Sequence, residues 1–98
     1  MRYRQLGSEL KVSALGLGGM AMTDLYGATD DAESIATVRA ALDAGASFID
    51  TADAYGGGKN EELIGKALRD GYRDKAIVAS KFGNVRDAQG RPAADGRP

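Results

Sequence analysis

The alternation of short apolar runs with amphipathic helical patterns constrains this fold most. Apolar runs at 12–20, 46–50 and 76–81 are typical of buried strands, and two helical patterns separate them. Strands that alternate with helices form a parallel sheet with right-handed crossovers. The sequence therefore predicts an α/β fold with the order β-α-β-α-β, preceded by an N-terminal β-hairpin that turns at Gly7 and Ser8.

Both predicted helices carry start and stop signals. Asp30 and Glu33 have capping-box spacing before the first apolar stripe, and Gly45 is predicted to end that helix. Asn60 is predicted to cap the second helix and Gly71 to end it. The helices therefore connect the three strands in turn.

Three chemically distinct side chains follow the second and third strands. Asp50 ends the apolar run at 46–50, Tyr55 lies five residues later, and Lys81 ends the third run. Taken singly, such residues usually cap a turn, pack on the surface or point into solvent. Because the carboxyl ends of parallel strands share one edge, we expect the three to lie together, where α/β folds bind ligands.

An acid, a phenol and an ammonium on one edge suit proton donation. Tyrosine is a weak acid with a reference pKa near 10, and a neighbouring ammonium such as Lys81 favours the phenolate. A carboxylate such as Asp50 holds that lysine in place and keeps it charged. The trio therefore predicts a proton-donating Tyr55 for a reaction that leaves negative charge on a carbonyl oxygen.

Composition excludes several other functions. The 98 residues are 43% hydrophobic and 28% charged, with a net charge of -1 and no run of about five or six like charges, so we expect neither a nucleic-acid nor a membrane partner. There is no cysteine and no histidine, which argues against disulfides, thiolate catalysis and the usual zinc sites, and no metal site is expected. The N-terminus lacks an apolar signal segment, so a cytoplasmic location is the default expectation.

The three strand regions together resemble one known family. The segments VSALGLGGM, FIDTADAYGGGKNEELIGKAL and KAIVASKFG are similar, in order and spacing, to the first strand regions of the aldo-keto reductases. The resemblance covers about residues 3–83 and implies part of a (β/α)8 TIM barrel that binds NADPH and reduces aldehydes and ketones.

The resemblance also assigns roles to individual residues. It implies that Tyr55 is the general acid, that Lys81 makes it a better acid, and that Asp50 braces Lys81 near the nicotinamide ribose. It further implies that Gly19 and Met20 touch the cofactor.

The chain departs from the family pattern in two ways. The family usually adds a histidine that orients the substrate carbonyl, and this chain has none. Residues 84–98 show no periodicity and are predicted to be an unstructured tail, so residues 1–98 are interpreted as an N-terminal barrel fragment. Three strands of a fold that typically takes about 250 residues leave exposed edges, so we expect marginal stability or self-association, and negligible turnover by the isolated chain.

Other interpretations remain. The run GLGGMA matches a dinucleotide-binding fingerprint, but its helix starts only at Asp30, too late for that motif. A non-catalytic cofactor sensor on the same scaffold and an inert truncated remnant are the alternatives to an enzyme. Met22, Leu25 and Tyr26 either line an apolar substrate wall or pack their own loop. The sequence fixes neither the substrate nor NADPH over NADH.

Overall fold

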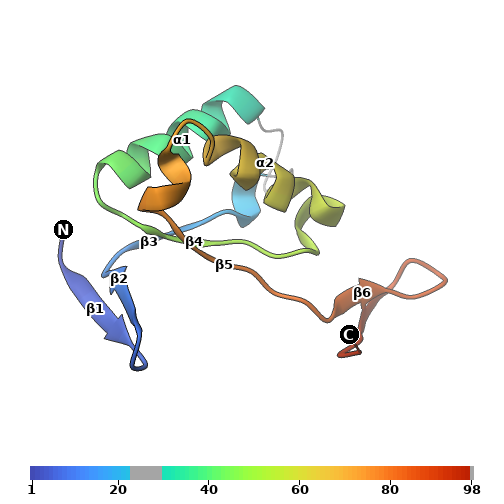
Figure 1. Cartoon of the computed structure of the whole chain (residues 1–98). Helices are drawn as coiled ribbons and strands as arrows, with labels where there is room; N and C mark the ends of the chain where they lie inside the picture. Colours follow the sequence, from blue (N-terminus) through green and yellow to red (C-terminus); the bar gives the residue numbers. More distant parts are fainter. Residues whose placement is uncertain (23–29, 98) are drawn as a thin grey trace.

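The structure, a computed structural model, describes residues 1–22 and 30–97. Three small sheets and two α-helices make up these residues (Figure 1). The predicted hairpin is confirmed: β1 (Tyr3–Leu6) pairs antiparallel with β2 (Leu10–Ser13). Gly7 in the turn has a φ of 66°, a conformation that glycine adopts without strain.

The central sheet is parallel, as predicted. Its order is β3 (Gly16–Gly18), β4 (Phe48–Asp50) and β5 (Ile77–Ala79). Each strand is shorter than its apolar run, and β3 starts only at Gly16 because residues 12 and 13 pair within the hairpin instead. Three parallel strands carry two helices, the arrangement expected for an open part of a (β/α)8 barrel.

The two helices, α1 (Asp31–Asp43) and α2 (Lys59–Ala67), lie on the same side of the three strands (Figure 1). The register places Leu17, Ile49 and Val78 side by side across the sheet, and all three pack in the core between sheet and helices. Ile49 is fully buried. The helices contribute Val38, Leu42, Ile64 and Ala67 to this core, and Leu68, the C-cap of α2, also belongs to it.

The start and end of α1 follow the sequence signals. The Asp30 side chain accepts a hydrogen bond from the backbone N–H of Glu33 at 3.1 Å, as an N-cap does. At the other end Gly45 has a φ of 93°, and the N–H groups of Gly45 and Ala46 reach back to the carbonyls of Leu42 and Ala41. This is a Schellman motif, which uses the left-handed conformation of glycine.

The predicted ends of the second helix are wrong. Asn60 is not its cap: the N-cap is Gly58, with a φ of 95° and no side-chain cap, and Asn60 is buried inside the first turn. The helix also ends at Ala67, before Gly71. Asp70 and Gly71, with φ values of 59° and 87°, reverse the chain into the short 3-10 helix η3 (Tyr72–Lys75).

The prediction of an unstructured tail over 84–98 is also wrong. Residues 84–94 form a second hairpin, in which β6 (Asn84–Arg86) pairs antiparallel with β7 (Pro92–Ala94). Its turn is held by Asp87, whose carboxylate accepts from the backbone N–H groups of Gln89 and Arg91 and pairs with the Arg91 guanidinium. Hydrogen bonds of polar turn residues stabilise this hairpin, so its sequence shows no hydrophobic periodicity that would predict strands.

The core predicts a contrast between two apolar truncations. We expect Ile49→Ala to lower the free energy of unfolding by about 2–5 kcal/mol, because removal of the buried side-chain atoms leaves a cavity. Leu15→Ala removes a side chain that is 67% exposed and should change it by less than about 0.5 kcal/mol. Urea denaturation monitored by circular dichroism measures both; equal effects would contradict this description of the core.

Candidate active site

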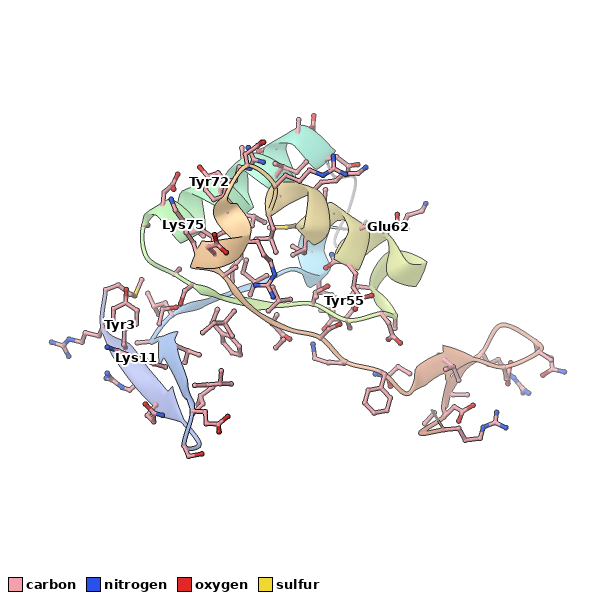
Figure 2. The ribbon with its side chains drawn as sticks, in the orientation of Figure 1. Tyr3, Lys11, Tyr55, Glu62, Tyr72 and Lys75 are labelled. Atoms are coloured by element: carbon pink, nitrogen blue, oxygen red, sulfur yellow. The ribbon has the colours of Figure 1, made fainter. Side chains whose placement is uncertain are left out.

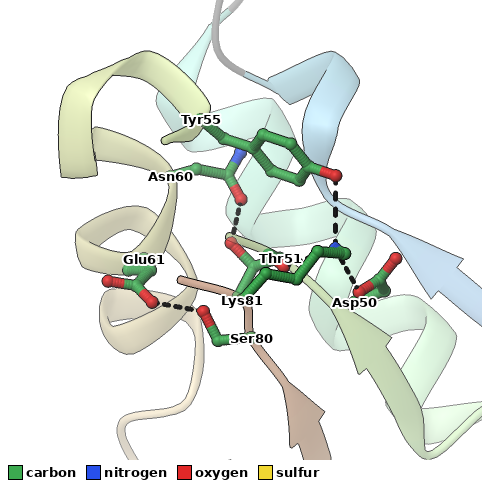
Figure 3. A network of polar contacts seen from close by, with 7 residues as sticks. All are labelled: Asp50, Thr51, Tyr55, Asn60, Glu61, Ser80 and Lys81. Carbon is green, nitrogen blue, oxygen red and sulfur yellow. Dashed lines mark hydrogen bonds and ion pairs between the residues drawn. The ribbon is translucent and has the colours of Figure 1, made fainter. Parts of the chain in front are cut away.

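Asp50, Tyr55 and Lys81, predicted to share one edge, come together at the carboxyl ends of the strands (Figure 3). Lys81 Nζ lies 2.7 Å from Asp50 Oδ1 and 3.2 Å from Tyr55 Oη. It also lies 5.0 Å from the centroid of the Tyr55 ring. The ammonium is therefore the centre of the cluster.

Sheet register gives Asp50 its place. Side chains alternate between the two faces of a strand, so Asp50 lies on the face opposite Ile49 and the helices. Its partners on the last rung are Gly18 and Ala79, which are among the smallest residues. Small neighbours leave room beside the carboxylate for the long side chain of Lys81.

Three glycines turn the chain directly after Tyr55. The 3-10 helix η2 (Tyr55–Gly58) contains Gly56 and Gly57 with φ values of 61° and 64°, and Gly58 follows at 95°. Consecutive left-handed residues are strained for any other amino acid. The GGG run thus lets a tyrosine at the strand edge be followed at once by α2.

In this cluster Lys81 is the hydrogen-bond donor and its neighbours are the acceptors. The Lys81 ammonium donates to Asp50, to the backbone carbonyl of Thr51 at 2.8 Å and to the phenolic oxygen of Tyr55. A phenol that accepts from an ammonium keeps its own O–H for donation to another group. The arrangement can therefore hold a positively charged lysine behind a proton-donating tyrosine.

Lys81 is electrostatically perturbed. Its hydrogen bond to the Asp50 carboxylate raises the pKa of the ammonium above its ordinary value; partial desolvation opposes this, and Tyr55 adds to it. The two side chains are 41% and 49% exposed, so solvent screens the pair. The lysine stays protonated at neutral pH and the site remains open to a ligand.

The two residues predicted to touch a cofactor lie beside this cluster. Gly19 is buried just after β3; its N–H donates to the backbone carbonyl of Asp50 at 2.8 Å, and its carbonyl accepts from Asn60 and Met22. Met20 is half-buried and starts the 3-10 helix η1 (Met20–Met22). Gly19 thus has its backbone groups engaged within the chain. Leu25 and Tyr26, suggested for a substrate wall, lie outside the described residues, and Met22 is half-buried against the core.

Sequence reasoning missed the polar residues that surround the trio. Asn60, fully buried, bonds the carbonyl of Gly19. Figure 3 shows its second bond, to Thr51, and the bond that Ser80 donates to the Glu61 carboxylate. The signal for Asn60 was present: it lies three, four and seven residues before Leu63, Ile64 and Ala67, on the apolar stripe of α2. A polar residue on such a stripe indicates a buried hydrogen-bond network.

A second cluster of charges lies away from this edge. The Arg39 guanidinium and the Lys75 ammonium lie 4.7 and 4.9 Å from the centroid of the Tyr72 ring, and the Tyr72 hydroxyl donates to Asp43 at 3.0 Å. Figure 2 labels Tyr72 and Lys75. These contacts join η3 to α1 and concern packing. In the ranges that the structure describes, no helix has the length and apolar character required to cross a bilayer.

Comparison with known proteins identifies similar sequences and structures. A sequence profile of the aldo/keto reductase family matches residues 14–97. The chain is 49% identical over 84 residues to the aldo-keto reductase YhdN of Bacillus subtilis, a match that covers 83% of this chain and 25% of that protein. The chain thus spans about a quarter of the length of this curated relative.

Solved structures of aldo-keto reductases are similar to this chain in fold. An aldo-keto reductase of Bacillus halodurans in its holo form superposes with a TM-score of 0.76 at 40% identity, over 96% of this chain and 30% of that one. An aldo-keto reductase of Klebsiella pneumoniae in complex with NADPH gives a TM-score of 0.69 at 36% identity, over 84% of this chain and 28% of that one.

The Lys81 pairing gives a prediction that needs no turnover. Replacing Asp50 by Asn removes the main cause of the raised pKa, so we expect the Lys81 pKa to fall toward its ordinary value of 10.5. Nitrogen-15 NMR of the lysine ammonium groups measures this. Asp43→Asn, which removes a carboxylate paired with Lys75 instead, should leave Lys81 unchanged. An unaltered Lys81 pKa in Asp50→Asn would contradict the pairing.

The ion pair between Lys81 and Asp50 also predicts how the stability of the chain depends on pH. Because the folded-state pKa of Lys81 is raised, its stabilising effect is complete below the ordinary pKa of 10.5 and is lost as the pH rises through the raised value. We therefore expect the alkaline loss of stability to be smaller in Asp50→Asn than in the unaltered chain. Thermal unfolding between pH 9 and pH 12 measures the difference, and parallel curves would contradict it.

Proposed function

Because this chain belongs to the aldo/keto reductase family, we propose that it supplies the proton-donating part of an oxidoreductase site that reduces aldehydes or ketones to alcohols with NADPH. The observation that carries the proposal is the Lys81 ammonium, held between the Asp50 carboxylate and the Tyr55 phenol. The homologous proteins are aldo-keto reductases, and one is solved with NADPH.

The residues fit proton transfer to a carbonyl oxygen. Tyr55 is the group whose O–H faces the developing negative charge, and Lys81 stabilises the phenolate that remains after the proton leaves. Asp50 keeps Lys81 charged and oriented. Each role follows from the hydrogen bonds around one nitrogen atom.

The residues also fit part of a nicotinamide site. The half-exposed carboxylate of Asp50 can accept hydrogen bonds from ribose hydroxyls, and Met20, which follows Gly19 in the chain, offers half-buried apolar surface. Gly19 would contribute close approach of the backbone and no hydrogen bond, since its N–H and carbonyl already have partners in the chain. When bound, the cofactor supplies the hydride.

A chimera tests the proposal. In it, residues 1–98 replace the matching quarter of the Bacillus subtilis relative, and carbonyl-dependent NADPH oxidation is followed by absorbance. We expect Tyr55→Phe to lower kcat by about 10²–10⁴-fold with little change in KM, because the proton donor is removed and the ring retained.

Tyr72→Phe is the matched control, since Tyr72 contacts Asp43 on α1 and lies far from the site (Figure 2). It should retain the kcat of the parent chimera. An undiminished kcat in Tyr55→Phe would contradict the assigned role. A chimera that binds NADPH without turnover would favour a non-catalytic cofactor sensor.

The 98-residue chain by itself should show no NADPH-dependent carbonyl reduction above the level of its own Tyr55→Phe variant. The reason is length: the chain spans 25% of its curated relative, and the described residues provide one side of the site. The same absorbance assay at high protein concentration measures this. Turnover that depends on Tyr55 would show that the chain is complete as a reductase.

A further inference from the structure

Asn60 is a fully buried polar residue in the first turn of α2, within an otherwise apolar stripe. Its Oδ1 accepts a hydrogen bond from Thr51 Oγ1 at 2.5 Å, and its Nδ2 donates to the carbonyl of Gly19 at 2.6 Å. Thr51 is 1% exposed. Burying an amide is costly unless both ends are bonded, and here both are.

These bonds join three segments that are distant in sequence. Gly19 follows β3, Thr51 follows β4, and Asn60 belongs to α2. The packing is close: a Cβ on Gly19 would lie 2.8 Å from Asn60 Oδ1 and 3.2 Å from the backbone oxygen of Asp50. A side chain at position 19 would displace the amide, so the observed position of Asn60 requires glycine there.

The network leads directly to the ammonium. Thr51 follows Asp50 in the chain, and its backbone carbonyl accepts from Lys81 Nζ at 2.8 Å (Figure 3). Gly19, held by Asn60, also donates to the backbone carbonyl of Asp50. Two of the three acceptors around Lys81 therefore belong to residues that the buried amide holds in place.

The next residue of α2 acts on the other side of the lysine. Glu61 accepts a hydrogen bond from Ser80, which directly precedes Lys81 (Figure 3). The first turn of α2 thus holds the chain next to Asp50 and the chain next to Lys81. Unlike Asn60, this pair is exposed, so solvent competes for it.

We propose that Asn60 is a positioning residue, which through Thr51 and Gly19 fixes the Asp50 carboxylate and the Thr51 carbonyl around the Lys81 ammonium and so orients Tyr55. Its meaning for catalysis rests on the proposed function, but its action on Lys81 does not. A merely structural Asn60 would affect stability alone. A positioning Asn60 also determines how Lys81 titrates.

The experiment uses the 98-residue chain labelled with nitrogen-15 lysine and carbon-13 tyrosine. The measurements are the Lys81 pKa and the nuclear Overhauser contact between the Lys81 side chain and the Tyr55 ring. Thr51→Val keeps the shape of the residue and removes the hydroxyl that bonds Asn60, whereas Thr51→Ser keeps the hydroxyl. Asn60→Ala removes the amide and with it the bonds to Thr51 and Gly19. Ile64→Val is the matched control, because it trims a buried side chain of the same helix and removes no hydrogen-bonding group.

We expect Thr51→Val and Asn60→Ala to lower the Lys81 pKa and to weaken the contact of Lys81 with Tyr55. Thr51→Ser, which keeps the hydroxyl, should leave both as in the unaltered chain. Ile64→Val should lower the unfolding midpoint without moving Lys81. If Asn60→Ala does not fold, Thr51→Val decides alone. An unchanged Lys81 in folded Thr51→Val, or an equal shift in Ile64→Val, would overturn the proposal.

The proposed function can fail independently. If Thr51→Val moves Lys81 while the chimera keeps its full kcat in Tyr55→Phe, the positioning role of Asn60 stands and the catalytic role of Tyr55 falls. If Thr51→Val leaves Lys81 unmoved while Tyr55→Phe abolishes turnover, the reverse holds.

Discussion

Parallel hydrogen bonding of β3, β4 and β5 is the constraint on which the rest of this structure depends. The ladder continues past the strand ends, where Gly19 donates to Asp50, Thr51 to Ala79 and Asp53 to Lys81. These bonds hold together the chain segments from which the site residues extend. The same register sends Ile49 toward the helices and Asp50 to the opposite face. One set of backbone bonds therefore defines both the core and the site.

The helices serve the site as well as the core. α2 presents Ile64 and Ala67 to the sheet, and one turn earlier the same stripe presents Asn60 to the ends of β3 and β4. An apolar side chain there would fill the space but would leave the buried Thr51 hydroxyl without its acceptor and the Gly19 carbonyl with one donor fewer. Because buried polar groups are costly when unpaired, this network has one well-satisfied arrangement. The site is thus supported by groups that solvent cannot reach.

Much of this architecture could be read from the sequence. The alternation of apolar runs and helical stripes predicted the parallel sheet, and Asp30 and Gly45 were identified correctly at the two ends of α1. The two errors at α2 share a cause. Asn60 is a residue type that often caps helices and Gly71 one that often ends them, but in the structure Gly58 is the N-cap and the helix ends at Ala67. The hairpin at 84–94 was missed because turn hydrogen bonds and not apolar side chains hold it.

The sequence by itself determined the order of the elements and the three side chains gathered at the strand ends. It did so because periodicity reports which residues face a core, and because parallel strands end at one edge. The pairing of Lys81 with Asp50 and Tyr55 was expected, but only the tertiary structure gave its geometry and decided that Asn60 is a buried link between strand ends. Such contacts join residues that are between 9 and 41 positions apart, and local pattern carries no information about distances of that kind.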